Sequence, residues 1–332
     1  MPTESAEALS PPDLWGQPVF ARIHGEIDPF EDLSCFRPLD RAYTGDNTFW
    51  TVPSPEPRLS DDFWRDVAGH LDDERIQAAA QTLAAAVTRW EPRGDRLVFA
   101  AILRAGVPVA DWLCRLIPGA RAAALSLFVG LGIDGVALGA LRRRYPERKV
   151  VFVDGWTGRG GVARTIAALN QGPLAVLVDP WGWADFSGAG EDIFCPTACF
   201  TGVATLGFSR TFFVDETRLF GAFRFPARYR REALVAAWQA CCPAPGRADA
   251  ARPEPPSRFF RETPLRIHAN EVCRALINAA PRKLLFRDGA PRVARRYPLL
   301  LRLAERREVP VQCGVDSLGE LRTRVACTLA AG

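Results

Sequence analysis

The sequence predicts an α/β protein built around a parallel β-sheet, and three observations carry this prediction. Four segments have the length of strands: residues 97–103, 123–130, 149–154 and 174–179. Their apolar residues run almost without interruption, as in strands that helices cover on both faces. Segments with a helical pattern lie between them, and such alternation of strand and helix is typical of parallel strands joined by crossover helices.

The other elements can be justified in chain order. Residues 1–20 are rich in proline and polar residues, so we expect a flexible N-terminus. Residues 21–65 carry aromatic residues and prolines without a clear period, which indicates irregular structure packed on a core. Residues 72–90 begin with acidic residues and are dominated by alanine, which predicts a helix. The strand-like segments are followed by further expected helices within residues 104–117, 132–146 and 160–170.

Two domains are expected, with a linker between them. Residues 21–242 would form the sheet domain, and the proline-rich stretch 243–264 with its alternating charge is typical of a semi-rigid linker. Residues 265–332 twice show a helix followed by a strand, which fits a small α/β domain. This segment holds 13 basic and 6 acidic residues, a hint of a polyanionic partner. Exposed helices in an arginine-rich chain would explain the same excess.

Composition excludes several classes of protein. No apolar run is long enough to cross a bilayer, and no basic segment precedes an apolar core at the N-terminus, so we expect a cytoplasmic protein without membrane contact. The nine cysteines are scattered and odd in number, which favours reduced thiols over a disulfide framework. The three histidines do not adjoin a cysteine and no pair of CxxC motifs exists, so no structural zinc site is expected.

A glycine-rich turn after the third strand has the properties of an anion site. The segment DGWTGRGG (154–161) ends a strand and opens a helix. Its glycines would let backbone N–H groups approach an anion at the N-terminus of the helix, and Thr157 would add a hydroxyl donor. Asp154 could accept hydrogen bonds from sugar hydroxyls. The same glycines would also suit a tight turn that binds nothing, and a P-loop is excluded because its lysine is absent.

Two loops together resemble those of type I phosphoribosyltransferases. VVFVDGWTG (150–158) resembles their phosphoribosyl-diphosphate loop, and ILRAGVPVADWL (102–113) resembles their diphosphate loop. The resemblance implies a Rossmann-like sheet domain in which Asp154 and Arg104 are the catalytic candidates. Gly155 stands where the family has a second acid, which weakens the expectation for ribose recognition. The remaining candidates for contact with phosphoribosyl diphosphate and its Mg²⁺ are Ala105, Gly106, Gly155, Thr157, Gly158, Arg159, Gly160 and Gly161.

A broader resemblance covers residues 97–215. GIDGVALGALRRRYPERKVVFVDGWTGRGGVAR and the later LAVLVDPWGWADFSGAGEDIFCPTACFTGVATLGFSRT resemble phosphoribosyltransferase-like proteins of bacterial tellurium-resistance and stress gene clusters, for which the designation StiP-type cysteine protease is also used. In that family a Pelota-type RNA-binding domain, related to the ribosomal L7Ae fold, follows the transferase domain. RIHANEVCRALINAAPRKLLFRDG resembles it, so the resemblance implies RNA as a partner of residues 265–332.

Three functions follow from these observations. The first is Mg²⁺-dependent transfer of ribose 5-phosphate from phosphoribosyl diphosphate to a nitrogenous base or nucleoside, with catalysis by positioning and electrostatics. The second is a non-catalytic sensor of phosphoribosyl diphosphate or nucleotides that binds RNA. The third is a cysteine hydrolase, which requires an imidazole beside Cys35, Cys195 or Cys199. Buried inert thiols are the alternative to this last role.

Some polar residues near the expected sheet edge have two interpretations each. Asp134 would cap a helix, and Asp179 ends a strand at the ligand edge. Trp181 and Trp183 could stack on a base or pack in a core. Arg142–Arg144 could face a diphosphate or simply end a helix favourably.

Overall fold

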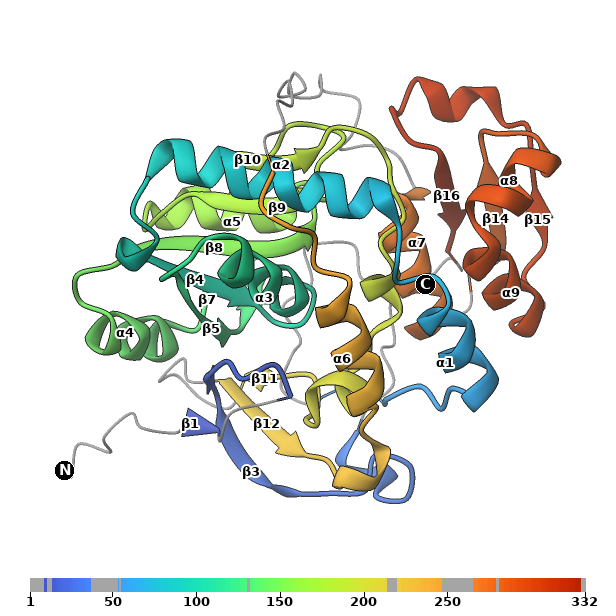
Figure 1. Cartoon of the computed structure of the whole chain (residues 1–332). Helices are drawn as coiled ribbons and strands as arrows, with labels where there is room; N and C mark the ends of the chain where they lie inside the picture. The colour runs from blue at the N-terminus through green and yellow to red at the C-terminus, as the bar shows by residue number, and fades with distance from the viewer. Residues whose placement is uncertain are drawn as a thin grey trace.

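The fold was taken from a computed structural model of the whole chain (Figure 1). The structure describes residues 9–10, 14–36, 53, 55–129, 132–213, 220–246, 265–278 and 281–329. Most of the expected linker 243–264 and part of the expected flexible segment 1–20 therefore lie outside the described residues.

A seven-stranded sheet forms the centre of the protein. Six of its strands are parallel, and only the first pair, at one edge, is antiparallel. The predicted strands 97–103, 149–154 and 174–179 are confirmed as β4 (Leu97–Ile102), β8 (Lys149–Trp156) and β9 (Leu174–Val178). The predicted strand 123–130 is divided between β5 (Arg121–Leu125) of this sheet and β6 (Leu127–Phe128) of a two-stranded sheet. The order across the sheet is β1 (Leu9–Ser10), β2 (Val19–Phe20), β5 (Arg121–Leu125), β4 (Leu97–Ile102), β8 (Lys149–Trp156), β9 (Leu174–Val178) and β10 (Phe186–Ala189).

Helices cover both faces of this sheet, as the apolar strands require. Alternate residues of β4 belong to different apolar clusters: Phe99 and Ala101 pack with α2 (Glu74–Trp90) and α3 (Gly106–Leu116), whereas Val98 and Ala100 pack on the other face. Successive side chains of a strand point to opposite faces, so each face of β4 receives its own layer. The second layer consists of α4 (Gly135–Arg144) and α5 (Gly161–Leu169).

A smaller sheet lies below the central one in Figure 1. It joins β3 (Arg22–Glu26) to β12 (Phe220–Arg224) in parallel, and β11 (Phe212–Phe213) pairs with β12. The aperiodic segment 21–65 therefore contains a strand and also α1 (Asp61–Ala68), which Ser60 caps.

The other elements before residue 247 are a short hairpin, one further α-helix and several single-turn helices. They are β6 (Leu127–Phe128), β7 (Gly132–Ile133), α6 (Glu232–Ala240), η1 (Leu33–Cys35), η2 (Gly94–Arg96), η3 (Pro196–Cys199), the π-helical η4 (Gly202–Leu206) and η5 (Ala227–Tyr229).

The C-terminal residues form a four-stranded sheet with helices, the red and orange part of Figure 1. The expected helix–strand order is present, because α7 (Ala269–Asn278) precedes β14 (Lys283–Phe286), and α8 (Ala290–Arg296) and α9 (Pro298–Arg306) precede β15 (Val311–Gln312). The sheet also contains β13 (Leu265–Ile267) and β16 (Val325–Thr328), and η7 (Asp316–Gly319) precedes β16. None of the described helices is long and apolar enough to cross a membrane.

Helix α7 connects the two parts of the molecule. It packs against η3, and its buried Val272, Cys273 and Leu276 belong to the same apolar cluster as the core of the central sheet. The C-terminal residues are thus docked through a buried apolar contact rather than tethered beside the sheet.

Candidate functional site

A cavity of about 220 Å³ lies where the end of β8 and the start of α5 meet the C-terminal residues. Asp154 and the turn Thr157–Gly161, both named as candidates from the glycine-rich motif, line one side. The opposite side comes from β13 and α7, through Arg266 and Glu271. Local sequence patterns did not indicate these last two residues, because no motif says how one domain docks on another.

Asp154 is one of two acidic residues that line the cavity, the other being Glu271. Its Oδ1 accepts the N–H of Gly155 at 2.7 Å. Burial raises the pKa of Asp154 to about 7; the hydrogen bond from Gly155 opposes this shift, and the nearby charge of Glu271 adds to it. Asp154 is therefore a carboxyl group that exchanges its proton near neutral pH.

Thr157 does not direct its hydroxyl into the cavity as the phosphate hypothesis expected. The hydroxyl donates to Oδ1 of Asp179 at 2.6 Å, and the backbone N–H of Thr157 donates to the carbonyl of Val178 at 3.0 Å. Asp179, expected at the ligand edge, is fully buried and also accepts the N–H groups of Trp181 and Ala184. The pair holds two loops of the sheet edge together.

Packing explains the glycines of the turn. Gly160 has φ of 75°, and a Cβ there would lie 2.6 Å from the Trp183 indole. A Cβ on Gly158 would lie 3.2 Å from Cγ of Glu271. Both glycines thus allow close approach by side chains of the protein itself, which is the alternative interpretation of the motif.

Glu271 joins the two sides of the cavity. Its Oε1 accepts the indole N–H of Trp156 at 2.8 Å, and its Oε2 pairs with Arg266 at 2.6 Å. Burial works to raise the pKa of Glu271, but Arg266 and Trp156 outweigh it and hold that pKa below the usual value. Glu271 is therefore a charged, fully engaged side chain rather than a free acid.

The Arg104 turn adjoins the end of β8 but does not line the cavity. A Cβ on Gly155 would lie 3.1 Å from that of Ala105, and one on Gly106 would lie 2.1 Å from the carbonyl oxygen of Val153. The side chain of Arg104 pairs with the buried Glu56 at 3.2 Å. The two predicted loops thus contact each other at their backbones. The guanidinium of Arg104 belongs to a separate ion pair with Glu56.

The described residues offer little for a metal ion. They contain no group of three or more His, Cys, Asp and Glu side chains that could hold one. At the cavity, Glu271 is already engaged, so Asp154 is the one acid of the predicted motif facing it. These residues do not fit a resident Mg²⁺, and no chemical step below is assigned to one.

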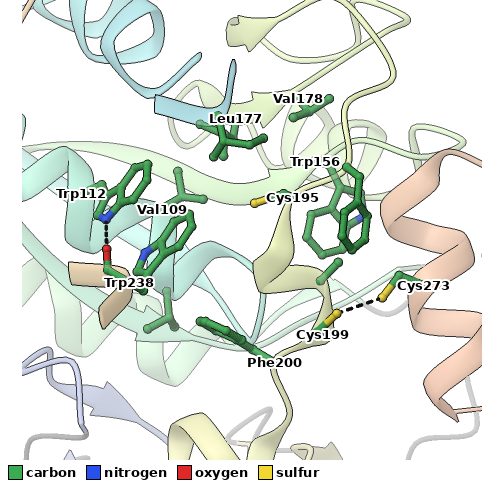
Figure 2. Packing of buried hydrophobic residues seen from close by; sticks show 14 of the residues in the cluster. Val109, Trp112, Trp156, Leu177, Val178, Cys195, Cys199, Phe200, Trp238 and Cys273 are labelled. Carbon is green, nitrogen blue, oxygen red and sulfur yellow. Dashed lines mark hydrogen bonds between the residues drawn. The ribbon is translucent and has the colours of Figure 1, made fainter. Parts of the chain in front are cut away.

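Three cysteines lie where η3 packs against α7 (Figure 2). Cys195 and Cys199 flank η3, and Sγ of Cys199 lies 3.6 Å from Sγ of Cys273 on α7. Sγ of Cys195 lies 3.1 Å from the hydroxyl of Thr197. Burial raises the pKa of the Cys195 thiol to about 11, and the contact with Cys273, together with burial, raises that of Cys199 well above its usual value.

A buried polar network links Cys195 to a histidine. Asn270 accepts the N–H of Cys195 at 2.7 Å and donates to the carbonyl of Ile193 at 3.1 Å. The adjacent His268 has its Nδ1 3.3 Å from Oδ1 of Asp192 and 3.1 Å from the N–H of Asn270. Nε2 of His268 is buried and has no partner among the described residues. Burial lowers the pKa of His268, which keeps the ring neutral at pH 7.

The other histidines and cysteines do not form such a set in the described structure. No described cysteine is hydrogen-bonded to a histidine. Nδ1 of His70 is hydrogen-bonded to the carbonyl oxygen of Asp66 instead. Cys35 packs beside Phe36 in a separate apolar cluster. Asp134, by contrast, caps α4 as predicted, since Oδ1 accepts the N–H of Ala137 at 2.8 Å.

The comparisons with known proteins bear on the three functions. A family described as tellurite-like stress resistance cysteine protease StiP matches residues 47–231, more than half of the chain. The chain belongs to this family. Cysteine protease StiP of Acinetobacter baylyi is 30% identical over 157 residues, which are 43% of this chain and 39% of the relative. The chain thus matches well under two thirds of the length of that curated relative, and no solved structure matches it.

The expectation of a phosphoribosyltransferase is therefore wrong. The family and the relative are both described as cysteine proteases, which was the third function considered. The physical reason lies in the loops: Thr157 is bonded to Asp179, and Arg104 is bonded to Glu56. What the comparisons do confirm is the relationship to tellurite-type stress resistance. They identify neither a phosphoribosyltransferase fold nor a Pelota domain.

Proposed function

We propose that this chain is a thiol peptidase of a stress response, with Cys195 as its nucleophile. The observation that carries the proposal is the buried network that joins the backbone N–H of Cys195, through Asn270, to the Asp192–His268 pair. A thiol, an imidazole and an orienting carboxylate are the parts that nucleophilic catalysis requires. Cys195 and Asp192 both lie within the residues that match the family.

His268 has the protonation behaviour of a general base. A neutral imidazole is the form that accepts a proton, and burial keeps His268 in that form. With its proton on Nδ1, the ring would direct that proton toward Asp192, whose Oδ1 lies 3.3 Å away, and would leave Nε2 free to take the thiol proton. With its proton on Nε2, Nδ1 instead accepts the N–H of Asn270. Activation thus requires the first tautomer, and Asp192 favours it.

In the described conformation the proposed nucleophile is covered by other residues. Cys195 is fully buried, and its raised pKa keeps the sulfur protonated. A peptide carbonyl reaches Sγ only after the segment around η3 and α7 has opened. The thiolate would then attack the carbonyl, and a thioester would form as the amine leaves with the proton from His268. Water would release the acyl group and restore the thiol.

The test compares serine variants of neighbouring cysteines. Fluorescently labelled casein is incubated with the reduced full chain and with Cys195→Ser, Cys199→Ser and Cys114→Ser. We expect Cys195→Ser to lose at least 100-fold in rate. Cys114→Ser should retain the rate because Cys114 lies in α3, outside both η3 and α7. Equal cleavage by wild type and Cys195→Ser would refute Cys195 as the nucleophile.

A second comparison tests the base. His268→Gln should lose between about 100- and 10,000-fold in rate, whereas His70→Gln should keep it. Because His268 is buried, its variant is first checked for a native circular dichroism spectrum and melting curve. A folded His268→Gln with an unchanged rate and pH profile would exclude this histidine.

RNA remains a second proposal for the C-terminal residues. Basic side chains are exposed from the residue before β14 to α8: Arg282, Lys283, Arg287, Arg292 and Arg295. Cations of this kind contact phosphates without reading sequence. Fluorescence anisotropy with a labelled single-stranded RNA should show affinity that falls steeply with salt, and binding unchanged by Arg287→Ala, Arg292→Ala and Arg295→Ala together would reject the surface.

A further inference from the structure

Cys199 and Cys273 form a thiol pair that the proposed peptidase mechanism does not use. Their Sγ atoms lie 3.6 Å apart, and both residues are fully buried. Cys199 closes η3 in the sheet part, and Cys273 lies in α7 of the C-terminal residues. Figure 2 shows the two sulfurs pointing toward one another across this contact.

We propose that Cys199 and Cys273 are a site of reversible disulfide formation that fastens α7 to the sheet part of the molecule. A disulfide requires sulfurs about 2 Å apart, so the two atoms must approach by roughly 1.5 Å. The sulfur of the other neighbouring thiol, Cys195, contacts the hydroxyl of Thr197 rather than either member of the pair. The geometry therefore selects one partner for Cys273.

The chemistry balances with a hydroperoxide as the oxidant. One thiol, once deprotonated, attacks the peroxide oxygen and becomes a sulfenic acid, while the hydroperoxide is reduced to an alcohol, or to water when the oxidant is hydrogen peroxide. The second thiol attacks the sulfenic sulfur, the S–S bond forms and water leaves. In total, two thiols lose two electrons and two protons, and the peroxide takes them up.

The residues around Cys199 and Cys273 determine how fast the disulfide forms and which parts of the chain it joins. Both thiols are buried, and the contact with Cys273 together with burial raises the pKa of the Cys199 thiol, so oxidation is slow and proceeds when α7 loosens. The guanidinium of Arg274 bonds to the carbonyl of Phe200, next to Cys199, and this contact returns the two sulfurs to register when α7 closes again. The bond would join residues 74 positions apart in the chain, across the whole segment 243–264.

The consequence for activity rests on the proposed function. Asn270 of the same helix bonds to the backbone of Cys195, so a bond at Cys273 would keep the covered conformation closed. Oxidation would then switch the peptidase off without touching its nucleophile.

The experiment maps the cross-link directly. The full chain is treated with hydrogen peroxide or diamide, denatured, alkylated with N-ethylmaleimide and digested with trypsin without reduction. Because Cys195 and Cys199 share one tryptic peptide, the mapping is done in Cys195→Ser as well as in wild type. We expect the peptide IHANEVCR (267–274) to be linked to the peptide that holds Cys199 in both proteins and in neither Cys199→Ser nor Cys273→Ser.

A second experiment tests whether the disulfide fastens α7 to the sheet part of the molecule. A site for a sequence-specific protease is placed within residues 247–264, and the cut protein is run on a gel without reductant. The oxidised chain should run as one band and the reduced chain as two fragments, and the oxidised form should melt several degrees higher. Cys114→Ser should behave as wild type.

Two results would overturn the proposal. One is that Cys199 and Cys273 are both alkylated after denaturation although other thiols have been oxidised. The other is that Cys273 is found linked to a different cysteine. Neither depends on peptidase activity, so a failed activity assay leaves the cross-link standing. Conversely, a mapped cross-link with full activity in peroxide, unchanged by Cys273→Ser, would remove the regulatory consequence alone.

Discussion

The hydroxyl of Thr157 donates to the carboxylate of Asp179 at 2.6 Å, and both side chains are buried. This bond joins the turn after β8 to the loop after β9, because Asp179 also holds the N–H groups of Trp181 and Ala184. A side chain that the motif assigned to a ligand is thus an internal brace of the sheet edge.

Removal of this brace should cost stability. Thr157→Val preserves the shape of the side chain but leaves a buried carboxylate without its hydroxyl donor, so we expect a loss of about 1–3 kcal/mol in the free energy of unfolding. Thr157→Ser keeps the donor and should lose much less. Urea unfolding followed by tryptophan fluorescence measures both, and equal stabilities of the valine and serine variants would contradict this role.

Gly106 should be intolerant of any side chain. A Cβ there would lie 2.1 Å from the carbonyl oxygen of Val153, a backbone atom that cannot move without disturbing β8. We expect Gly106→Ala to destabilise the protein by about 1–3 kcal/mol. Gly135→Ala is the matched control, since it also begins a helix and nothing lies within 4 Å of the added Cβ. Similar urea midpoints for the two variants would show that the turn relaxes freely.

The sheet was predictable because each strand had to be apolar on both faces. Residues 97–103 and 149–154 contain too many consecutive apolar side chains for any solvent-facing strand, and helical segments separate them. The strand Arg22–Glu26 was missed because most of it is half-buried or exposed, so it lacks an apolar signal. Val19 and Phe20 were likewise hidden in a proline-rich segment, although they are buried in β2.

The site was predictable only in part. Asp154 and the glycines were placed at a cavity because the end of a parallel strand and the start of a helix meet there. Glu271 and Arg266 were not, because the docking of α7 depends on apolar side chains far apart in the sequence. Resemblance between loops reports a shared turn geometry, and it does not report where a hydroxyl such as that of Thr157 is bonded.

Stability should fall in mild acid through His268. Burial lowers the pKa of His268 below its ordinary value of 6.5, so the unfolded chain binds a proton that the folded chain refuses. The stabilisation is fully present above pH 6.5 and is lost as the pH falls below it. Asp192, Asp179 and Glu271 face the ring and offset part of the loss. Melting temperatures from pH 8 to pH 5.5 should therefore fall more in wild type than in His268→Gln. A parallel course of the two curves would exclude the effect.

Asp154 should show the opposite dependence on pH. Burial raises the pKa of this carboxyl from 3.8 to about 7, so the folded chain holds a proton that the unfolded chain releases. The stabilisation from Asp154 is present below pH 3.8 and is lost as the pH rises through 7. Asp154→Asn keeps an oxygen that can accept the N–H of Gly155 and cannot ionise. We expect it to melt a few degrees above wild type at pH 8 and nearer to wild type at pH 5.

The control for this variant is Asp95→Asn, because Asp95 is exposed. Its substitution should change the melting temperature little at either pH, since exposed charges contribute little to stability. The quantity to compare is the melting temperature of Asp154→Asn minus that of Asp95→Asn. This difference is taken at pH 8, and the same difference at pH 5 is subtracted from it. A zero or negative value would mean that water or a nearby cation solvates the Asp154 carboxylate well, and the cavity would then be a wetter site than its apolar walls suggest.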